Sequence, residues 1–217
     1  MFNRTIIHEL RQWKERRDRK PLMMLGARQV GKTSVLKKFG EDSFEHCAYF
    51  SLDEEEGVCD IFRKTKNPQQ IIEQLSYLTF EPILPHKTLL ILDEIQDCPE
   101  AISAMKYFCE KTPEYAVACA GSLLGLAFGH QGFSFPVGKV DHMNMYPVTF
   151  SEFLEQRDAG LYQYYMSIDS LDPLPDVFFN RLSQAFTAYR ISGGMPAVAM
   201  KMIEKDLNGV ETMLRNI

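Results

Sequence analysis

Long apolar runs are absent from this sequence of 217 residues. No stretch approaches the roughly 18 consecutive apolar residues that predict a membrane-spanning helix. The N-terminus has no apolar segment of the kind found in a secretory signal peptide, and the chain contains no internal repeat and no low-complexity tract. These absences predict a cytoplasmic protein without a membrane partner.

The sequence also lacks a large excess of charge of one sign, and it lacks closely spaced cysteine pairs. The formal net charge is only −5, and its negative sign argues against broad non-specific binding to nucleic acid. The five cysteines are odd in number and include no C-x-x-C pair, which favours reduced, buried thiols over a disulfide or a metal site. Hydrophobic residues at 45% and charged residues at 24% are typical of a globular protein, and this length suits one large domain or one and a half.

A glycine-rich loop is the first feature that carries chemistry. The segment 26–33, GARQVGKT, follows an apolar run at 21–25 and precedes a helical pattern at 34–39. It fits the phosphate-binding pattern G-x-x-x-x-G-K-[ST]. Glycines allow positive φ and close approach, so that backbone N–H groups can point at phosphate oxygens, and the following helix adds its dipole. This context favours a nucleotide site over a simple glycine-rich turn.

The loop positions receive individual roles from this pattern. Lys32 is expected to reach the β- and γ-phosphates, and the Thr33 hydroxyl to occupy one position around an octahedral Mg²⁺. The nucleotide is expected to contact Gly26, Arg28, Gln29, Val30, Gly31, Lys32, Thr33 and Ser34.

A second stretch, TLLILDEIQ at 88–96, predicts a buried parallel strand with two carboxylates at its C-terminal end. Ligands of open α/β sheets bind at that edge. We expect Asp93 to hold Mg²⁺ through water and Glu94 to polarise the attacking water; the alternative is an acidic turn after a core strand. A further strand at 115–120 ends in Gly121-Ser122, where Ser122 could reach the γ-phosphate or serve as a turn or helix N-cap.

Other patterns complete an α/β domain. Helices are expected over 3–17, after the acidic run at 53–57, over 68–79 and over 99–111, and strands over 46–52 and 139–145. Residues 123–136 are expected to be mostly loop. A helix is expected from about Thr149 or Ser151 through Arg157, with Ser151 as its candidate N-cap, and helices at 162–168, 178–190 and up to 205 follow. The helical pattern still running at Ile217 predicts that the protein continues.

Two charged runs each allow two interpretations. The basic cluster at 16–20 is either a solvated helix end or a contact to nucleic acid or a partner. The acidic run at 53–57 is either a solvated loop that opens the next helix or part of a metal site.

The motifs GARQVGKT, LLILDEIQ, AGS, MYPVTFSEFL and GGMP, in this order, resemble the predicted bacterial and archaeal ATPases of the AAA superfamily over residues 20–200. The resemblance implies an α/β fold of the P-loop NTPase (AAA/ASCE) type, a three-layer sandwich with a mostly parallel five-stranded sheet and an extra strand between the P-loop strand and the acidic strand. It divides the chain into an ATPase core at 1–150 and a helical lid at 151–217. A restriction-endonuclease-like C-terminal domain often follows.

This resemblance also implies a function: magnesium-dependent ATP binding and hydrolysis, coupled to conformational change in a larger protein. Lys32 and Thr33 match Walker A, Asp93 and Glu94 match Walker B, and Ser122 takes the sensor position, which makes Glu94, Lys32 and Ser122 the expected catalytic residues. Pro196 of GGMP is the candidate nucleobase contact, or else part of an interhelix turn. No arginine matches a trans-acting finger, and the candidates are Arg157, Arg181 and Arg190. ATP is favoured over GTP because no N-K-x-D sequence occurs.

Three alternatives stay open at this point. The first alternative is a nucleotide switch with slow or no turnover. The second is a small-molecule kinase, which Glu94 beside Asp93 disfavours because a kinase must exclude water. The third is association with DNA through the basic helix end or a further domain. A protein partner or a C-terminal effector domain is expected, and the sequence leaves the oligomeric state open.

Overall fold

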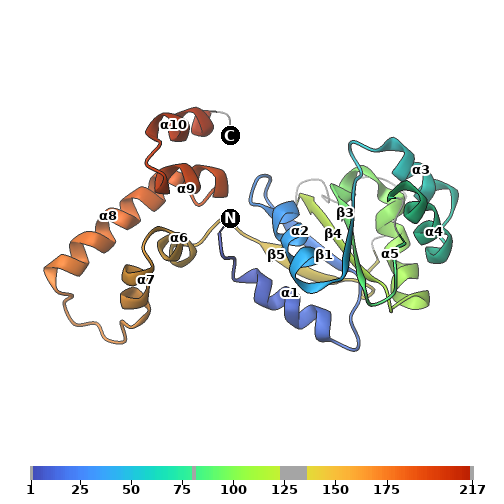
Figure 1. Ribbon diagram of the computed structural model, residues 1–217, viewed down its shortest axis with the longest axis horizontal. Coiled ribbons are helices and arrows are strands. Elements are labelled where there is room, and N and C mark those ends of the chain that lie inside the picture. Colours follow the sequence, from blue (N-terminus) through green and yellow to red (C-terminus); the bar gives the residue numbers. More distant parts are fainter. Residues whose placement is uncertain (1, 80–81, 123–135, 216–217) are drawn as a thin grey trace. The chain divides into compact units, whose positions relative to one another are not determined.

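A computed structural model describes residues 2–79, 82–122 and 136–215 (Figure 1). The chain divides into two compact units. The core unit is Ile6–Met145, and the helical unit is Tyr146–Ile217 together with Met1–Thr5. The first five residues, which the sequence analysis assigned to the core, therefore belong with the helical unit. The loop predicted at 123–136 lies almost entirely outside the described residues.

A five-stranded sheet forms the centre of the core unit. Its strand order is β2-β3-β4-β1-β5, and every strand pairing among the described residues is parallel. β4 lies between the P-loop strand β1 and the acidic strand β3, as the family resemblance implies. The strands are β1 (Leu22–Gly26), β2 (His46–Ser51), β3 (Thr88–Asp93), β4 (Ala116–Ser122) and β5 (Asp141–Met145).

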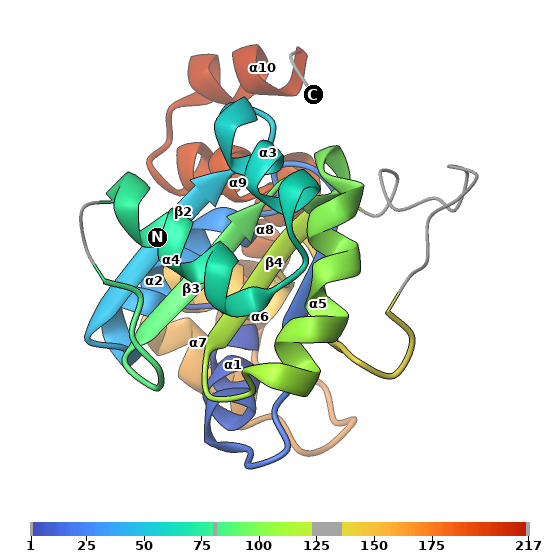
Figure 2. The same cartoon turned by 90° about the vertical axis from the view of Figure 1, so that its right-hand side faces the viewer.

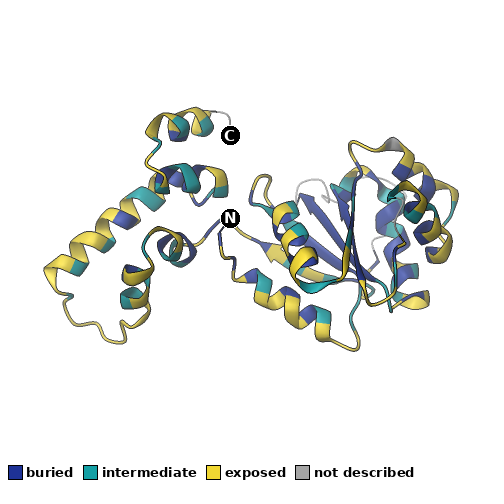
Figure 3. Ribbon diagram, viewed as in Figure 1, coloured by how far each residue is buried: buried dark blue, intermediate teal, exposed yellow. Residues whose placement is uncertain are grey.

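Helices cover both faces of this sheet, because successive strand residues point to opposite sides. On β3, Leu90 and Leu92 join one core cluster, whereas Leu89 and Ile91 join the other. The first cluster packs against α3 (Glu56–Lys64), α4 (Pro68–Thr79) and α5 (Pro99–Lys111), which Figure 2 shows on the near face of the sheet. The second packs against α1 (Ile6–Glu15) and α2 (Lys32–Ser43). The strands β1, β3 and β4 are consequently buried almost throughout (Figure 3).

The helical unit contains α6 (Phe150–Arg157), α7 (Ala159–Met166), α8 (Asp176–Ser192), α9 (Pro196–Ile203) and α10 (Leu207–Arg215). Thr149 caps α6, because its side chain accepts from the Glu152 N–H while the Glu152 carboxylate accepts from the Thr149 N–H. The prediction that Ser151 is the N-cap was therefore wrong: Ser151 lies inside the first turn. Within the described ranges, no helix is long and apolar enough to cross a membrane.

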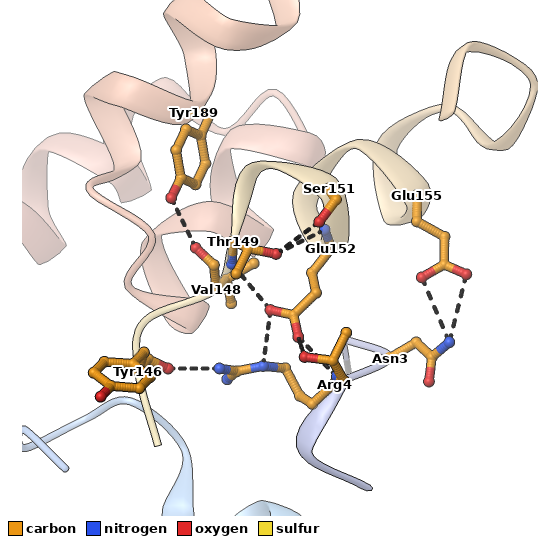
Figure 4. A network of polar contacts seen from close by, with 10 residues as sticks. Asn3, Arg4, Tyr146, Val148, Thr149, Ser151, Glu152, Glu155 and Tyr189 are labelled. Carbon is orange, nitrogen blue, oxygen red and sulfur yellow. Dashed lines mark hydrogen bonds and ion pairs between the residues drawn. The ribbon is translucent and has the colours of Figure 1, made fainter. Parts of the chain in front are cut away.

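A buried polar network ties the N-terminal segment to α6 (Figure 4). Glu152 accepts hydrogen bonds from the Thr5 N–H at 2.8 Å and the Thr5 hydroxyl at 3.0 Å, and it pairs with Arg4 at 3.1 Å. The Arg4 guanidinium also donates to the Tyr146 carbonyl at 2.6 Å. Burial by itself would raise the pKa of Glu152, but the N–H groups of Thr5 and Thr149 and the Arg4 charge outweigh it and hold that pKa below its usual value. These contacts explain why residues far apart in sequence form one unit.

Candidate nucleotide site

The candidate site lies at the carboxyl edge of the sheet, where three strands end side by side. Gly26 ends β1, and its register partners are Ser122 at the end of β4 and Met145 at the end of β5. Asp93 ends β3, the neighbour of β4 on the other side. This is the edge at which open α/β sheets bind ligands.

The two loop glycines are needed for different reasons. Gly31 has φ 93° and forms the N-cap of α2 in the left-handed region, where a side chain is strained. Gly26 is needed for close approach, because an added Cβ would lie only 2.3 Å from the Met145 carbonyl oxygen. Gln29 also has a positive φ of 62°. The backbone of the loop is therefore sharply curled, as a phosphate-binding loop requires.

The side chains of the loop point in different directions. Arg28, Gln29 and Ser34 are exposed. The side chain of Val30 packs into the core cluster that also contains residues of α2. Arg28, Gln29 and Ser34 can therefore meet a ligand with their side chains, whereas the side chain of Val30 cannot.

Lys32 turns back over the loop. Its ammonium donates to the carbonyl oxygens of Gly26 at 3.1 Å and Ala27 at 2.8 Å, and the residue is 7% exposed. Burial lowers the pKa of Lys32, while the nearby carboxylates of Glu94 and Asp93 oppose that shift. A cation with neutral carbonyl partners inside the loop can exchange them for the oxygens of an anion.

The loop and the acidic strand meet at one carboxylate oxygen. The Thr33 hydroxyl donates to Asp93 Oδ2 at 2.6 Å, and the Tyr49 hydroxyl donates to the same oxygen at 3.1 Å. The hydroxyl and the carboxylate are both hard oxygen ligands, the kind that Mg²⁺ prefers. The residues present therefore fit this ion.

Tyr49 is a site residue that the sequence analysis did not identify. It lies on β2 and pairs in register with Ile91 of β3, which brings its ring to the Asp93 side chain. Burial raises the pKa of Tyr49 to about 12, so its hydroxyl stays protonated and remains a donor at neutral pH. The Lys37 ammonium lies 3.4 Å from the centre of its ring.

Glu94 occupies a left-handed backbone conformation directly after β3, with φ 48° and ψ 47°. Its N–H donates to Asp93 Oδ1 at 3.1 Å, and its carboxylate accepts from the Gln96 amide at 2.5 Å. Conformations of this kind are uncommon for residues other than glycine and cluster at functional sites. The turn separates the two carboxylates so that each meets different partners.

The remaining predicted site residues lie in the helical unit. Pro196 is the first residue of α9, after a turn in which Gly193 and Gly194 have φ of 61° and 71°. Among the candidate finger arginines, Arg181 pairs with Asp158 at 2.6 Å and Arg157 stacks over Phe153 at 5.9 Å. Arg190 is exposed in the last turn of α8.

The charged runs have local partners in the core unit. Arg16 pairs with Asp18 at 3.2 Å and with Asp141 at 3.5 Å, which reduces the positive charge available to a nucleic acid at this helix end. In the acidic run, the Ser51 hydroxyl donates to Asp53 at 2.5 Å and the Ser51 N–H donates to Glu55 at 3.2 Å. These contacts give the run a role in shaping the turn before α3.

Comparisons with known proteins agree with this geometry. A family model described as an AAA domain matches residues 18–154. No curated protein matches the chain. Drosophila ORC bound to DNA is similar at a TM-score of 0.53 and 13% identity, covering 91% of this chain and 58% of that one. The replication initiator DnaA bound to AMPPCP and single-stranded DNA is similar at a TM-score of 0.53 and 14% identity, covering 99% and 64%. This chain thus spans less than two thirds of either one, and at such identity the likeness is one of fold.

Proposed function

This chain belongs to the AAA domain family, and we propose that its core unit binds ATP with Mg²⁺ and hydrolyses it. One observation carries the proposal: the Thr33 hydroxyl donates to Asp93, 60 residues away in sequence, at 2.6 Å. This contact joins the glycine loop to the acidic strand. It brings together two oxygen groups, the Thr33 hydroxyl and the Asp93 carboxylate, of the kind that Mg²⁺ prefers. The carboxylates of Asp93 and Glu94 also lie near enough to the Lys32 ammonium to affect its pKa.

Each residue has a role in this proposal. Lys32 exchanges its carbonyl contacts for phosphate oxygens. Thr33 would hold Mg²⁺ directly and Asp93 would hold it through water, and the ion would neutralise charge that develops on the phosphates. Glu94 orients the attacking water and takes up its proton. Ser122, at the end of the strand beside Gly26, acts as the sensor of the γ-phosphate. Tyr49 holds the Asp93 carboxylate in place.

The helical unit has a second role in the proposal. Pro196 contacts the nucleobase, and the nucleotide state drives a conformational change in a larger protein, as the family resemblance implies. None of the three candidate arginines is assigned as a finger. Hydrolysis without one is slow, since such an arginine contributes about 10³- to 10⁵-fold to the rate in related nucleotidases.

Phosphate release by Glu94→Gln tests the proposed base. We expect this variant to bind a fluorescent ATP analogue as the wild type does and to release phosphate about 10²- to 10⁴-fold more slowly, the usual contribution of a general base. The matched control is Glu73→Gln, which makes the same change on the exposed surface of α4 and should turn over normally. Unchanged turnover in Glu94→Gln would refute the assignment.

Two further measurements separate the alternatives. Wild-type protein that binds the analogue only with Mg²⁺ but releases no phosphate in a single turnover would be a nucleotide switch. DNA is a second candidate partner because both similar structures hold DNA. Retention of labelled DNA on a filter over a salt series would measure any such binding.

A further inference from the structure

Gln96 makes contacts that the proposed roles leave unexplained. It lies in the short 3-10 helix η1 (Ile95–Asp97), two residues after the proposed base. Its amide Nε2 donates to Glu94 Oε2 at 2.5 Å and to Asp97 Oδ2 at 3.1 Å. Its Oε1 accepts from the Ser122 N–H at 3.3 Å. One side chain thus touches both the Glu94 carboxylate and the end of β4.

The chemistry of the three partners fixes the orientation of this amide. Carboxylate oxygens of Glu94 and Asp97 accept hydrogen bonds, whereas the Ser122 N–H donates one. Only an amide with Nε2 toward the carboxylates and Oε1 toward Ser122 satisfies all three. A glutamate at this position has no donor, and a methionine has neither function.

Gly121 leaves the room that this arrangement needs. A Cβ added at Gly121 would lie 3.0 Å from Gln96 Oε1 and 3.0 Å from Ile95 Cγ2. Contacts this short force the neighbouring group to move. The glycine before Ser122 is therefore matched to the position of the Gln96 amide.

We propose that Gln96 is a positioning residue, which holds the Glu94 carboxylate in its working orientation and ties that orientation to the end of β4 at Ser122. The inference rests on the proposed hydrolysis of ATP. The fixed end of the tie is the strand: β4 is hydrogen-bonded between β1 and β3, while Glu94 lies on a turn. Removal of the tie therefore frees the carboxylate and leaves the nucleotide-binding loop intact.

Gln96→Met tests this role, since methionine is similar in length and forms no strong hydrogen bond. We expect kcat for ATP to fall about tenfold to a hundredfold, because displacement of a catalytic group by about 1 Å can cost on the order of 10²-fold. The Kd of a fluorescent ATP analogue should not change. The matched control is Gln74→Met. Among the contacts of the described chain, the Gln74 amide donates only to the Gln70 carbonyl of its own helix, at 3.3 Å. It should keep the wild-type kcat.

The same substitution in the Glu94→Gln background shows whether Gln96 acts through Glu94. A positioning residue has no further effect once the carboxylate is gone, so the double variant should equal Glu94→Gln alone. A further loss as large as in the wild-type background would overturn the proposal, as would an unchanged or increased kcat in Gln96→Met. Absence of phosphate release by the wild type would instead overturn the proposed function itself.

A measurement without turnover completes the test. The amide proton of Ser122 in ¹⁵N-labelled protein should shift in Gln96→Met, because it loses its acceptor, and should not shift in Gln74→Met. An unchanged Ser122 resonance would overturn the proposed tie. Should Gln96→Met fail to fold, Gln96→Leu takes its place in both measurements, with the same expected and contrary results, because leucine also lacks the amide.

Discussion

Replacement of Arg4 by methionine should destabilise the helical unit. Arg4 and Glu152 are 7% and 4% exposed, and removal of one partner of a buried ion pair typically costs about 3–5 kcal/mol. Glu152 keeps the donors of Thr5 and Thr149, so we expect a loss near 3 kcal/mol at the low end of that range. A unit of about 80 residues has roughly 4–12 kcal/mol of stability in total, so the loss is a large share.

Urea denaturation can follow the two units separately. Trp13 is the only tryptophan in the sequence, and it lies buried in the core unit, so its fluorescence reports that unit. Far-UV circular dichroism reports the helices of both. With a urea slope of about 1–3 kcal/mol/M, a loss of about 3 kcal/mol moves a midpoint by about 1–3 M. In Arg4→Met we expect the circular dichroism to change at lower urea than in the wild type, because the helical unit unfolds first. The midpoint of the Trp13 fluorescence transition should stay at its wild-type value.

A matched control and a double variant make this prediction refutable. Arg215→Met makes the same change in an exposed pair with Glu211 on α10 and should cost at most about 0.5 kcal/mol. Combining Arg4→Met with Glu152→Gln removes both charges, so the double variant should lose less stability than the two single losses added together. Additive losses, or an Arg4→Met melt that coincides with that of Arg215→Met, would show that the pair does not hold the segment in place.

Two other predictions concern acid stability and the glycine loop. The folded-state pKa of Glu152 lies below its usual value. The stability that ionised Glu152 contributes is therefore complete above the unfolded-state pKa of about 4.3 and is lost as the pH falls through the folded-state value. Urea midpoints of the helical unit should decline below about pH 4, and they should decline less in Glu152→Gln. Gly26→Ala should weaken binding of a fluorescent ATP analogue at least about tenfold and cost about 1–3 kcal/mol, because its Cβ meets the Met145 carbonyl. Gly57→Ala, where an added Cβ meets nothing within 4 Å, is the control, and equal analogue affinity in the two variants would contradict the steric argument.

Much of the core unit could be predicted from the sequence because its signals are local. The near-continuous apolar run at 88–92 predicted β3, and the loop at 26–33 predicted that a helix, α2, follows it. The family resemblance implied the position of β4 between β1 and β3. The prediction of Ser151 as N-cap was wrong because Thr149 and Ser151 are both good caps, and only the position of Glu152 decides between them.

The sequence by itself thus determined an α/β core with a glycine loop, an acidic strand and a helical C-terminal segment. The tertiary structure decided which side chains meet. Tyr49 reaches Asp93 across 44 residues of sequence, Gln96 reaches Ser122 across 26, and Arg4 reaches Glu152 across 148. Local propensity carries no information on such pairs. The pairing of β2 with β3 brings Tyr49 to Asp93, the end of β4 brings Ser122 to Gln96, and burial of the N-terminal segment against α6 brings Arg4 to Glu152. Hydrogen bonds and ion pairs act only over a few ångströms, so these contacts exist only once the chain has folded.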